Sequence, residues 1–277
     1  MKLGIIDYYL DEYHANHYPA WIKEASKNEI QVACAYAKID SPIGGMTTKE
    51  WHEKYKIPIV DSMEELIEKS DGIIVFSPDN PEQHEELCKL PFKSGKRVYV
   101  DKTFSETKKI AEDLFALAKK HNTLCYSASA LRFAAEYKDI DPSTVENIAS
   151  TGPGPLDQYS VHQLEPVVLL MGANISRVKY IGTQKWPAYI CEYDDGRQTV
   201  ISHHGDGCPF GMTVDFKDGT CKVLTVESDF YSHLIREMVD FFITGEIKAP
   251  HEQTIAIMAA REAAIKASRE PGIWVAL

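Results

Sequence analysis

The sequence predicts an α/β fold in two parts, an N-terminal parallel sheet and a C-terminal α+β domain with a mainly antiparallel sheet. In the first half, short apolar runs alternate with amphipathic segments, which is typical of parallel strands joined by crossover helices. In the second half, two Asp-Gly pairs separate runs rich in Tyr, Val, Ile and Thr, as in β-hairpins. Because the pattern changes near residue 130, we expect domains at 1–130 and 131–277.

Five apolar runs predict the strands of the parallel sheet, at residues 3–6, 32–36, 72–76, 97–100 and 124–127. Between the last two, Ile110, Leu114, Leu117 and Ala118 recur at helical spacing, and Ser105 is placed to cap this helix. In the second half, Asp195-Gly196 and Asp218-Gly219 predict tight hairpin turns. Helices are expected at 158–171, at 231–244 with Gly245 as a stop, and at 252–269.

Composition and charge exclude several classes of function. The 277 residues are 44% hydrophobic and 26% charged, as in an ordinary globular chain long enough for two modest cores. A net charge of −11 disfavours nucleic acid and anionic membranes as partners. The six cysteines are scattered singly, as expected of reduced thiols, and no apolar run approaches the roughly 20 residues of a membrane span. We therefore expect a cytoplasmic protein.

The turn after the first strand lacks the glycines of a dinucleotide-binding unit. Where G-x-G-x-x-G would stand, the glycine positions hold Asp7, Tyr9 and Glu12. Glycine lets the backbone approach the pyrophosphate, which Tyr9 would obstruct. The carboxylates of Asp7, Asp11 and Glu12 would also repel a dianionic pyrophosphate. The local residues thus oppose cofactor binding at this turn.

Two interpretations of this acidic and aromatic segment stay open. Tyrosines and carboxylates suit a sugar, with His14 among the candidate substrate contacts. Alternatively, Asp11 and Glu12 complement the dipole of the following helix without any ligand. At the end of the second strand, Lys38 is a candidate for the 2′-phosphate of NADP.

Several ordered motifs resemble the Gfo/Idh/MocA family of glucose-fructose oxidoreductase and inositol dehydrogenase. Residues 95–103 read GKRVYVDKT, similar to the family's G-K-x-V-x-x-E-K-P, and Arg132-Phe133 follow downstream. Residues 77–80 read SPDN, and residues 152–172 read GPGPLDQYSVHQLEPVVLLMG, similar to the family's histidine-bearing helix. The resemblance implies a Rossmann-type dinucleotide-binding domain, a substrate-binding and dimerisation domain, and NAD or NADP as cofactor.

The resemblance also implies an oxidoreductase acting on a sugar, polyol or related secondary alcohol. Such a reaction needs one group that accepts the hydroxyl proton and another that holds the oxygen. The family's lysine falls on Lys102 and its histidine on His162, with Gln158 in place of the family's acid as the third catalytic candidate. Substrate contacts are expected from Lys102, Tyr159, His162, Glu165 and His14, and cofactor contacts from Asp7, Tyr9, Lys38, Ser77, Pro78, Asp101 and Lys102.

Two rival functions remain. A metal-dependent enzyme would use His203, His204, Asp206 and Cys208, although adjacent histidines on a strand point to opposite faces. Alternatively, the chain is a non-catalytic protein that binds a carbohydrate-like ligand on a dehydrogenase scaffold. The resemblance further implies a homo-oligomer, formed through the hairpin-rich segment 189–226.

Overall fold

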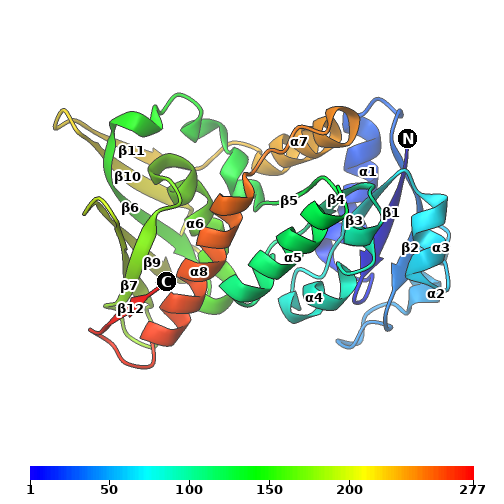
Figure 1. Cartoon of the computed structure of the whole chain (residues 1–277), viewed down its shortest axis with the longest axis horizontal. Coiled ribbons are helices and arrows are strands. Elements are labelled where there is room, and N and C mark those ends of the chain that lie inside the picture. The colour runs from blue at the N-terminus through cyan, green and yellow to red at the C-terminus, as the bar shows by residue number, and fades with distance from the viewer. The chain divides into compact units, whose positions relative to one another are not determined.

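Five parallel strands form the first sheet of the computed structural model, which describes all 277 residues (Figure 1). Their order is β2-β1-β3-β4-β5, with every neighbouring pair parallel. Each strand lies within one or two residues of its predicted range, because a strand covered on both faces is a continuous apolar run. The bounds are β1 Lys2–Asp7, β2 Gln31–Ala37, β3 Gly72–Val75, β4 Arg97–Val100 and β5 Cys125–Ser127.

Helices connect these strands, and the predicted long helix is α5, Lys108–Lys120. Of its predicted apolar stripe, Leu114 and Ala118 are buried and Ile110 and Leu117 are half-buried. Thr107 caps the helix in place of Ser105. The Thr107 hydroxyl accepts the backbone N–H of Ile110 at 3.3 Å, whereas the Ser105 hydroxyl donates to the Thr107 carbonyl. The other helices here are α1 Tyr13–Ala25, α2 Thr48–Tyr55, α3 Met63–Lys69 and α4 His84–Leu87.

The second sheet has seven strands in the order β11-β10-β6-β9-β8-β7-β12. It is mainly antiparallel, as predicted, with one parallel pair, β6 with β9. Both Asp-Gly pairs form the predicted hairpin turns, and Gly196 and Gly219 each have φ of 86°. The bounds are β6 Val145–Pro153, β7 Ile175–Tyr180, β8 Ala188–Tyr193, β9 Gln198–His204, β10 Gly211–Phe216, β11 Cys221–Thr225 and β12 Trp274–Ala276.

Two helices pack together beside this sheet, α6 (Leu156–Met171) and α8 (His251–Ala267). Helix α6 packs on β6, and α8 packs on β7 and β12. Most of α6 is buried, both the apolar run of its C-terminal half and the polar residues Ser160, Gln163 and Glu165. A short 3-10 turn, η3 (Ala130–Phe133), also packs on α6 and carries Arg132. No helix of the chain is long and apolar enough to cross a membrane.

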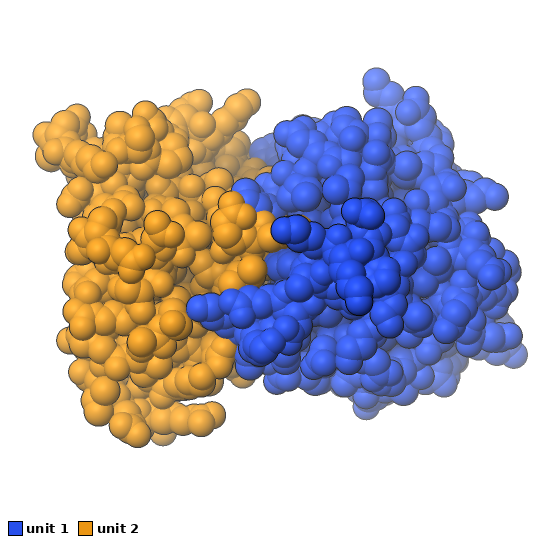
Figure 2. Space-filling model, in the orientation of Figure 1, with its two compact units in different colours: residues 1–128, 232–250 blue, residues 129–231, 251–277 orange.

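The division into two units differs from the expected 1–130 and 131–277. The first unit comprises Met1–Ala128 and Ser232–Pro250, and the second comprises Ser129–Tyr231 and His251–Leu277 (Figure 2). Helix α7 (Phe230–Thr244) therefore joins the first unit almost entirely. Its Phe241 ring lies 4.9 Å from that of Tyr126, and the Phe242 carbonyl accepts a hydrogen bond from Arg97 at 2.5 Å. These contacts assign α7 to the parallel sheet.

Candidate functional site

Glu12 caps the N-terminus of α1, the helix that follows β1. Its carboxylate accepts the backbone N–H of His14 at 2.7 Å and that of Ala15. Asp11 instead accepts from the Asn16 side chain at 3.0 Å and the Met46 backbone at 2.7 Å. Free N–H groups at a helix N-terminus are the groups that bind a dinucleotide pyrophosphate. The helix-dipole interpretation is therefore confirmed for Glu12, whose carboxylate holds two of those groups.

Asp7 ends β1 as a buried carboxyl group, with a side chain only 1% exposed. Neither of its oxygens makes a hydrogen bond of good geometry. Burial raises the pKa of Asp7 well above its ordinary value, and the nearby Glu12 raises it further. Burial also raises the pKa of Glu12, to about 7, although His14 and the capped N–H groups oppose this effect. The turn thus holds two acids that resist ionisation.

His14 and Asp101 form a buried pair, with His14 Nδ1 lying 2.6 Å from Asp101 Oδ2. Burial lowers the pKa of His14, but the Asp101 carboxylate outweighs it and leaves the pKa raised. The pKa of Asp101 is lowered despite burial, because His14 and then Lys102 stabilise its charge. His14 is only 6% exposed, which does not support its predicted contact with substrate.

Tyr9, which was expected to obstruct the turn, is folded into the protein and only 5% exposed. Burial raises its pKa to about 12, and the charge of Asp79 adds to the shift. Lys38, the candidate for a 2′-phosphate, is already paired with Glu86, its Nζ lying 2.6 Å from the carboxylate. Neither side chain is free for the role predicted from the sequence.

Three predicted residues do come together at the carboxyl ends of β3 and β4. Lys102 follows β4, is half-buried, and its Nζ donates to the Pro78 carbonyl at 3.3 Å. Ser77 has φ of 114°, and its hydroxyl donates to the Asn80 carbonyl at 2.9 Å. The loop of Ser77 and Pro78 therefore supports the Lys102 ammonium at the edge where open α/β sheets bind ligands.

In the second unit, His162 is half-buried on α6 and bonded to Ser129. Its Nδ1 lies 2.7 Å from the Ser129 hydroxyl. The rings of Tyr159 and Phe210 lie 5.3 Å and 5.9 Å from the imidazole. Ser129 fixes the orientation of the ring and was not predicted, although it stands only three residues before Arg132 of the motif. Gln158 is exposed and forms no part of this cluster.

Glu165, predicted to contact substrate, is buried in an ion pair. Arg132 Nη1 lies 3.1 Å from one carboxylate oxygen, and the Ser129 backbone N–H donates to the other at 2.9 Å. Arg132 also donates to the side chain of Gln253. Burial raises the pKa of Glu165, and the guanidinium limits the rise. Both oxygens are engaged, which favours a structural role over contact with substrate.

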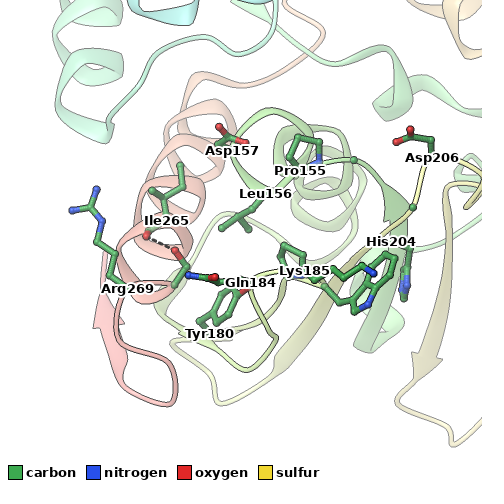
Figure 3. A pocket seen from close by; sticks show the side chains of 15 residues that line it. Pro155, Leu156, Asp157, Tyr180, Gln184, Lys185, His204, Asp206, Ile265 and Arg269 are labelled. Atoms are coloured by element: carbon green, nitrogen blue, oxygen red, sulfur yellow. Dashed lines mark hydrogen bonds between the residues drawn. The ribbon is translucent and has the colours of Figure 1, made fainter.

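A cavity of about 700 Å³ lies in the second unit (Figure 3). The loop before α6, the β7–β8 connection and the ends of β9 and α8 line it, and none of the predicted catalytic residues does. His204 and Asp206 line it, whereas His203 is buried on the opposite side of β9 and bonded to the Gly154 carbonyl at 3.1 Å. No three potential metal ligands lie together, so the metal-dependent interpretation has no support.

The first unit is an open parallel sheet with Lys102 at its carboxyl edge, where open α/β folds bind ligands. Residues 11–129 match the Gfo/Idh/MocA family, described as an oxidoreductase family with an NAD-binding Rossmann fold. This match confirms the predicted resemblance over most of the first unit, and the family it describes binds NAD. No curated protein matches the sequence.

Solved structures share the fold over almost the whole chain. GenD2 from gentamicin A biosynthesis, in complex with NAD, has 14% identity and a TM-score of 0.78, covering 100% of this chain and 96% of its own. UDP-N-acetylglucosamine 3-dehydrogenase GnnA from Acidithiobacillus ferrooxidans has 12% identity and a TM-score of 0.77, covering 98% and 97%. A Desulfitobacterium hafniense protein assigned as an NADPH-dependent oxidoreductase has 17% identity and a TM-score of 0.73, covering 99% and 97%.

One part of the family's cofactor does not suit the residues present here. A pyrophosphate seated on α1 needs the N–H groups that the Glu12 carboxylate already holds, and it would lie beside the buried acid Asp7. The structure therefore gives the dinucleotide no phosphate cradle at this turn.

Proposed function

We propose that the protein is an NAD(P)-dependent oxidoreductase acting on a sugar, polyol or related secondary alcohol. The observation that carries this proposal is Lys102, held at the carboxyl edge of the parallel sheet within a motif of the matched family. Structural neighbours that act on sugars, such as UDP-N-acetylglucosamine 3-dehydrogenase, support the substrate class.

In this proposal Lys102 and His162 share the two tasks that alcohol oxidation requires. The Lys102 ammonium holds the substrate oxygen and stabilises the negative charge that develops on it. His162 accepts the hydroxyl proton at Nε2, in the tautomer whose Nδ1–H donates to the Ser129 hydroxyl. Ser129 is a positioning residue, because it fixes this tautomer without touching the substrate.

The test is formation of reduced nicotinamide when the purified protein is given NAD⁺ or NADP⁺ with a panel of sugars and polyols. We expect turnover with at least one secondary alcohol, and markedly lower turnover for the Lys102→Ala variant. The exposed Lys49 provides a matched control, and Lys49→Ala should behave as the unaltered protein. Turnover that survives in Lys102→Ala would remove this lysine from the mechanism.

A second candidate is a non-catalytic protein that binds a carbohydrate-like ligand. The capping of α1 by Glu12 favours it, because a protein that needs no dinucleotide can fill the phosphate position with its own side chain. Tight sugar binding without turnover under any cofactor would support this second candidate.

Location and assembly belong to the same proposal. All six cysteines are free, which supports the cytoplasm as the location. A homo-oligomer through residues 189–226 is tested by light scattering of the purified protein.

A further inference from the structure

At the start of α1, a side chain of the protein occupies backbone N–H groups that bind a ligand in a Rossmann unit. In a Rossmann unit, glycines bring the backbone close to the pyrophosphate, and the first N–H groups of the helix bind its oxygens. Here Glu12 stands at the last glycine position, adopts extended backbone geometry, and turns its carboxylate back onto those N–H groups. The carboxylate and a phosphate would compete for the same donors.

The surrounding charges also oppose a phosphate at this position. Asp7 and Asp101 lie close enough to influence the charge on Glu12, and all three acids are buried. The imidazole of His14 in this cluster is already paired with the Asp101 carboxylate. Asp7 has no hydrogen-bonding partner that would neutralise it. A dianion brought here would meet the Asp101 carboxylate and the ionised fraction of Glu12, and the charge of Lys102 already stabilises Asp101.

The space beside the turn is filled as well. The Tyr9 side chain, at the second glycine position, is buried and lies beside Asp79 of the loop after β3. A glycine at this position leaves the backbone accessible, whereas the tyrosine ring covers it. The steric and the electrostatic features of this turn therefore both oppose a phosphate there.

We infer that Glu12 is an internal substitute for the dinucleotide pyrophosphate, and that it determines how strongly and in what position a nicotinamide dinucleotide binds. With Glu12 in place, the dinucleotide binds with its pyrophosphate away from the N-terminus of α1. Removing the carboxylate frees the N–H groups that it holds and so strengthens phosphate binding at the helix. This inference rests on the proposed function only in taking a nicotinamide dinucleotide as the ligand.

The experiment measures binding by calorimetry, with ADP-ribose and NADH as the probes. ADP-ribose carries the pyrophosphate without the nicotinamide, so it reports on the phosphate position independently of turnover. Glu12→Gly removes the side chain and keeps a residue that helix N-caps tolerate, while Glu12→Gln removes only the charge. Glu24→Gln, at an exposed position of the same helix, is the matched control.

We expect Glu12→Gly to bind ADP-ribose at least about tenfold more tightly than the unaltered protein, and Glu24→Gln to bind it equally. Glu12→Gln keeps an oxygen on the same N–H groups, so it should bind ADP-ribose more tightly by a smaller factor. Unchanged affinity in two folded Glu12 variants would overturn the inference, as would submicromolar binding of ADP-ribose to the unaltered protein. Because Glu12→Gln conserves shape, it keeps the test valid if Glu12→Gly fails to fold. Absence of turnover with bound NAD(P) would instead contradict the proposed function.

Discussion

Arg132 Nη1 lies 3.1 Å from Glu165 Oε2, and both side chains are only 3% exposed. The pair joins the short turn that follows β5 to the middle of α6, within the second unit. Ser129 donates its backbone N–H to Glu165, and its hydroxyl bonds to His162. The ion pair therefore helps to fix the residue that orients the candidate catalytic histidine.

Breaking this pair should destabilise the protein strongly. Arg132→Met or Glu165→Leu leaves an uncompensated buried charge, and we expect each to lower the free energy of unfolding by about 3–5 kcal/mol in urea denaturation. The double variant should recover most of this loss, because it buries no charge. As a control, Glu262→Gln breaks the more exposed pair with Lys266 and should cost less than about 1 kcal/mol. A double variant as unstable as the singles would show that the pair itself stabilises the fold.

Lys102→Ala should lower kcat/KM by about 10²- to 10⁴-fold, the usual loss when a positioned proton-transfer or charge-stabilising group is removed. Because Lys102 is half-buried and bonded only to a carbonyl, the melting temperature should change little. Steady-state kinetics and thermal unfolding of this variant and of Lys49→Ala provide the measurement. Near-normal turnover in Lys102→Ala would contradict the prediction.

Ser129→Ala should reduce kcat by about 10- to 100-fold, because His162 keeps its place but loses the bond that orients it. The pH profile of kcat/KM should also shift, which loss of packing alone would not produce. Ser129→Thr keeps the hydroxyl and should restore both the rate and the profile. Equal profiles for the alanine variant and the unaltered protein would limit Ser129 to a role in folding.

Stability should fall as the pH rises from about 5 to about 8. Asp7, Glu12, His14 and Glu165 have raised pKa values, so between these limits they hold protons in the folded protein that the unfolded chain releases. They outnumber the buried histidines His84 and His203, whose lowered pKa values act in the opposite direction. A group whose pKa is higher in the folded state stabilises the protein fully at pH values below its pKa in the unfolded chain. This stabilisation is lost once the pH rises above its pKa in the folded protein. The lowered pKa of Asp101 acts only below this range.

Thermal unfolding across that range provides the measurement. Glu12 alone should contribute a change on the order of 2 kcal/mol, because its pKa is raised from 4.5 to about 7. Glu12→Gln should therefore flatten the dependence, while Glu24→Gln should leave it unchanged. Parallel curves for all three proteins would exclude Glu12 as the titrating group.

Local sequence patterns predicted most of the elements. The buried strands are short apolar runs, and the hairpins follow from Asp-Gly turns that need positive φ. The cap of α5 was misplaced by two residues, because Ser105 and Thr107 offer the same chemistry and only the path of the chain selects one. The parallel pairing of β6 with β9 joins strands far apart in sequence, and no local pattern encodes it.

The candidate site was harder to predict for the same reason. A motif placed Lys102 and His162, but the partners that decide their surroundings lie far along the chain. Asp101 pairs with His14, 87 residues away in the sequence, and Arg132 pairs with Glu165, 33 residues away. Periodicity specifies which face of a helix is buried and carries no information about the charge that meets it. The sequence therefore predicts Glu165 as a ligand contact, whereas in the structure both of its carboxylate oxygens are bonded within the protein.

Helix α7 has a consequence for how the chain acquires its fold during synthesis. Domains generally form as units while the ribosome extends the chain from the N-terminus. The first unit includes Ser232–Pro250, and Phe241 covers Tyr126 on the last strand of the parallel sheet. That sheet stays partly uncovered until residues 232–250 have emerged, after nearly all of the second unit has been made. We therefore expect the nascent N-terminal half to keep apolar surface of the sheet exposed until the late-synthesised helix packs on it.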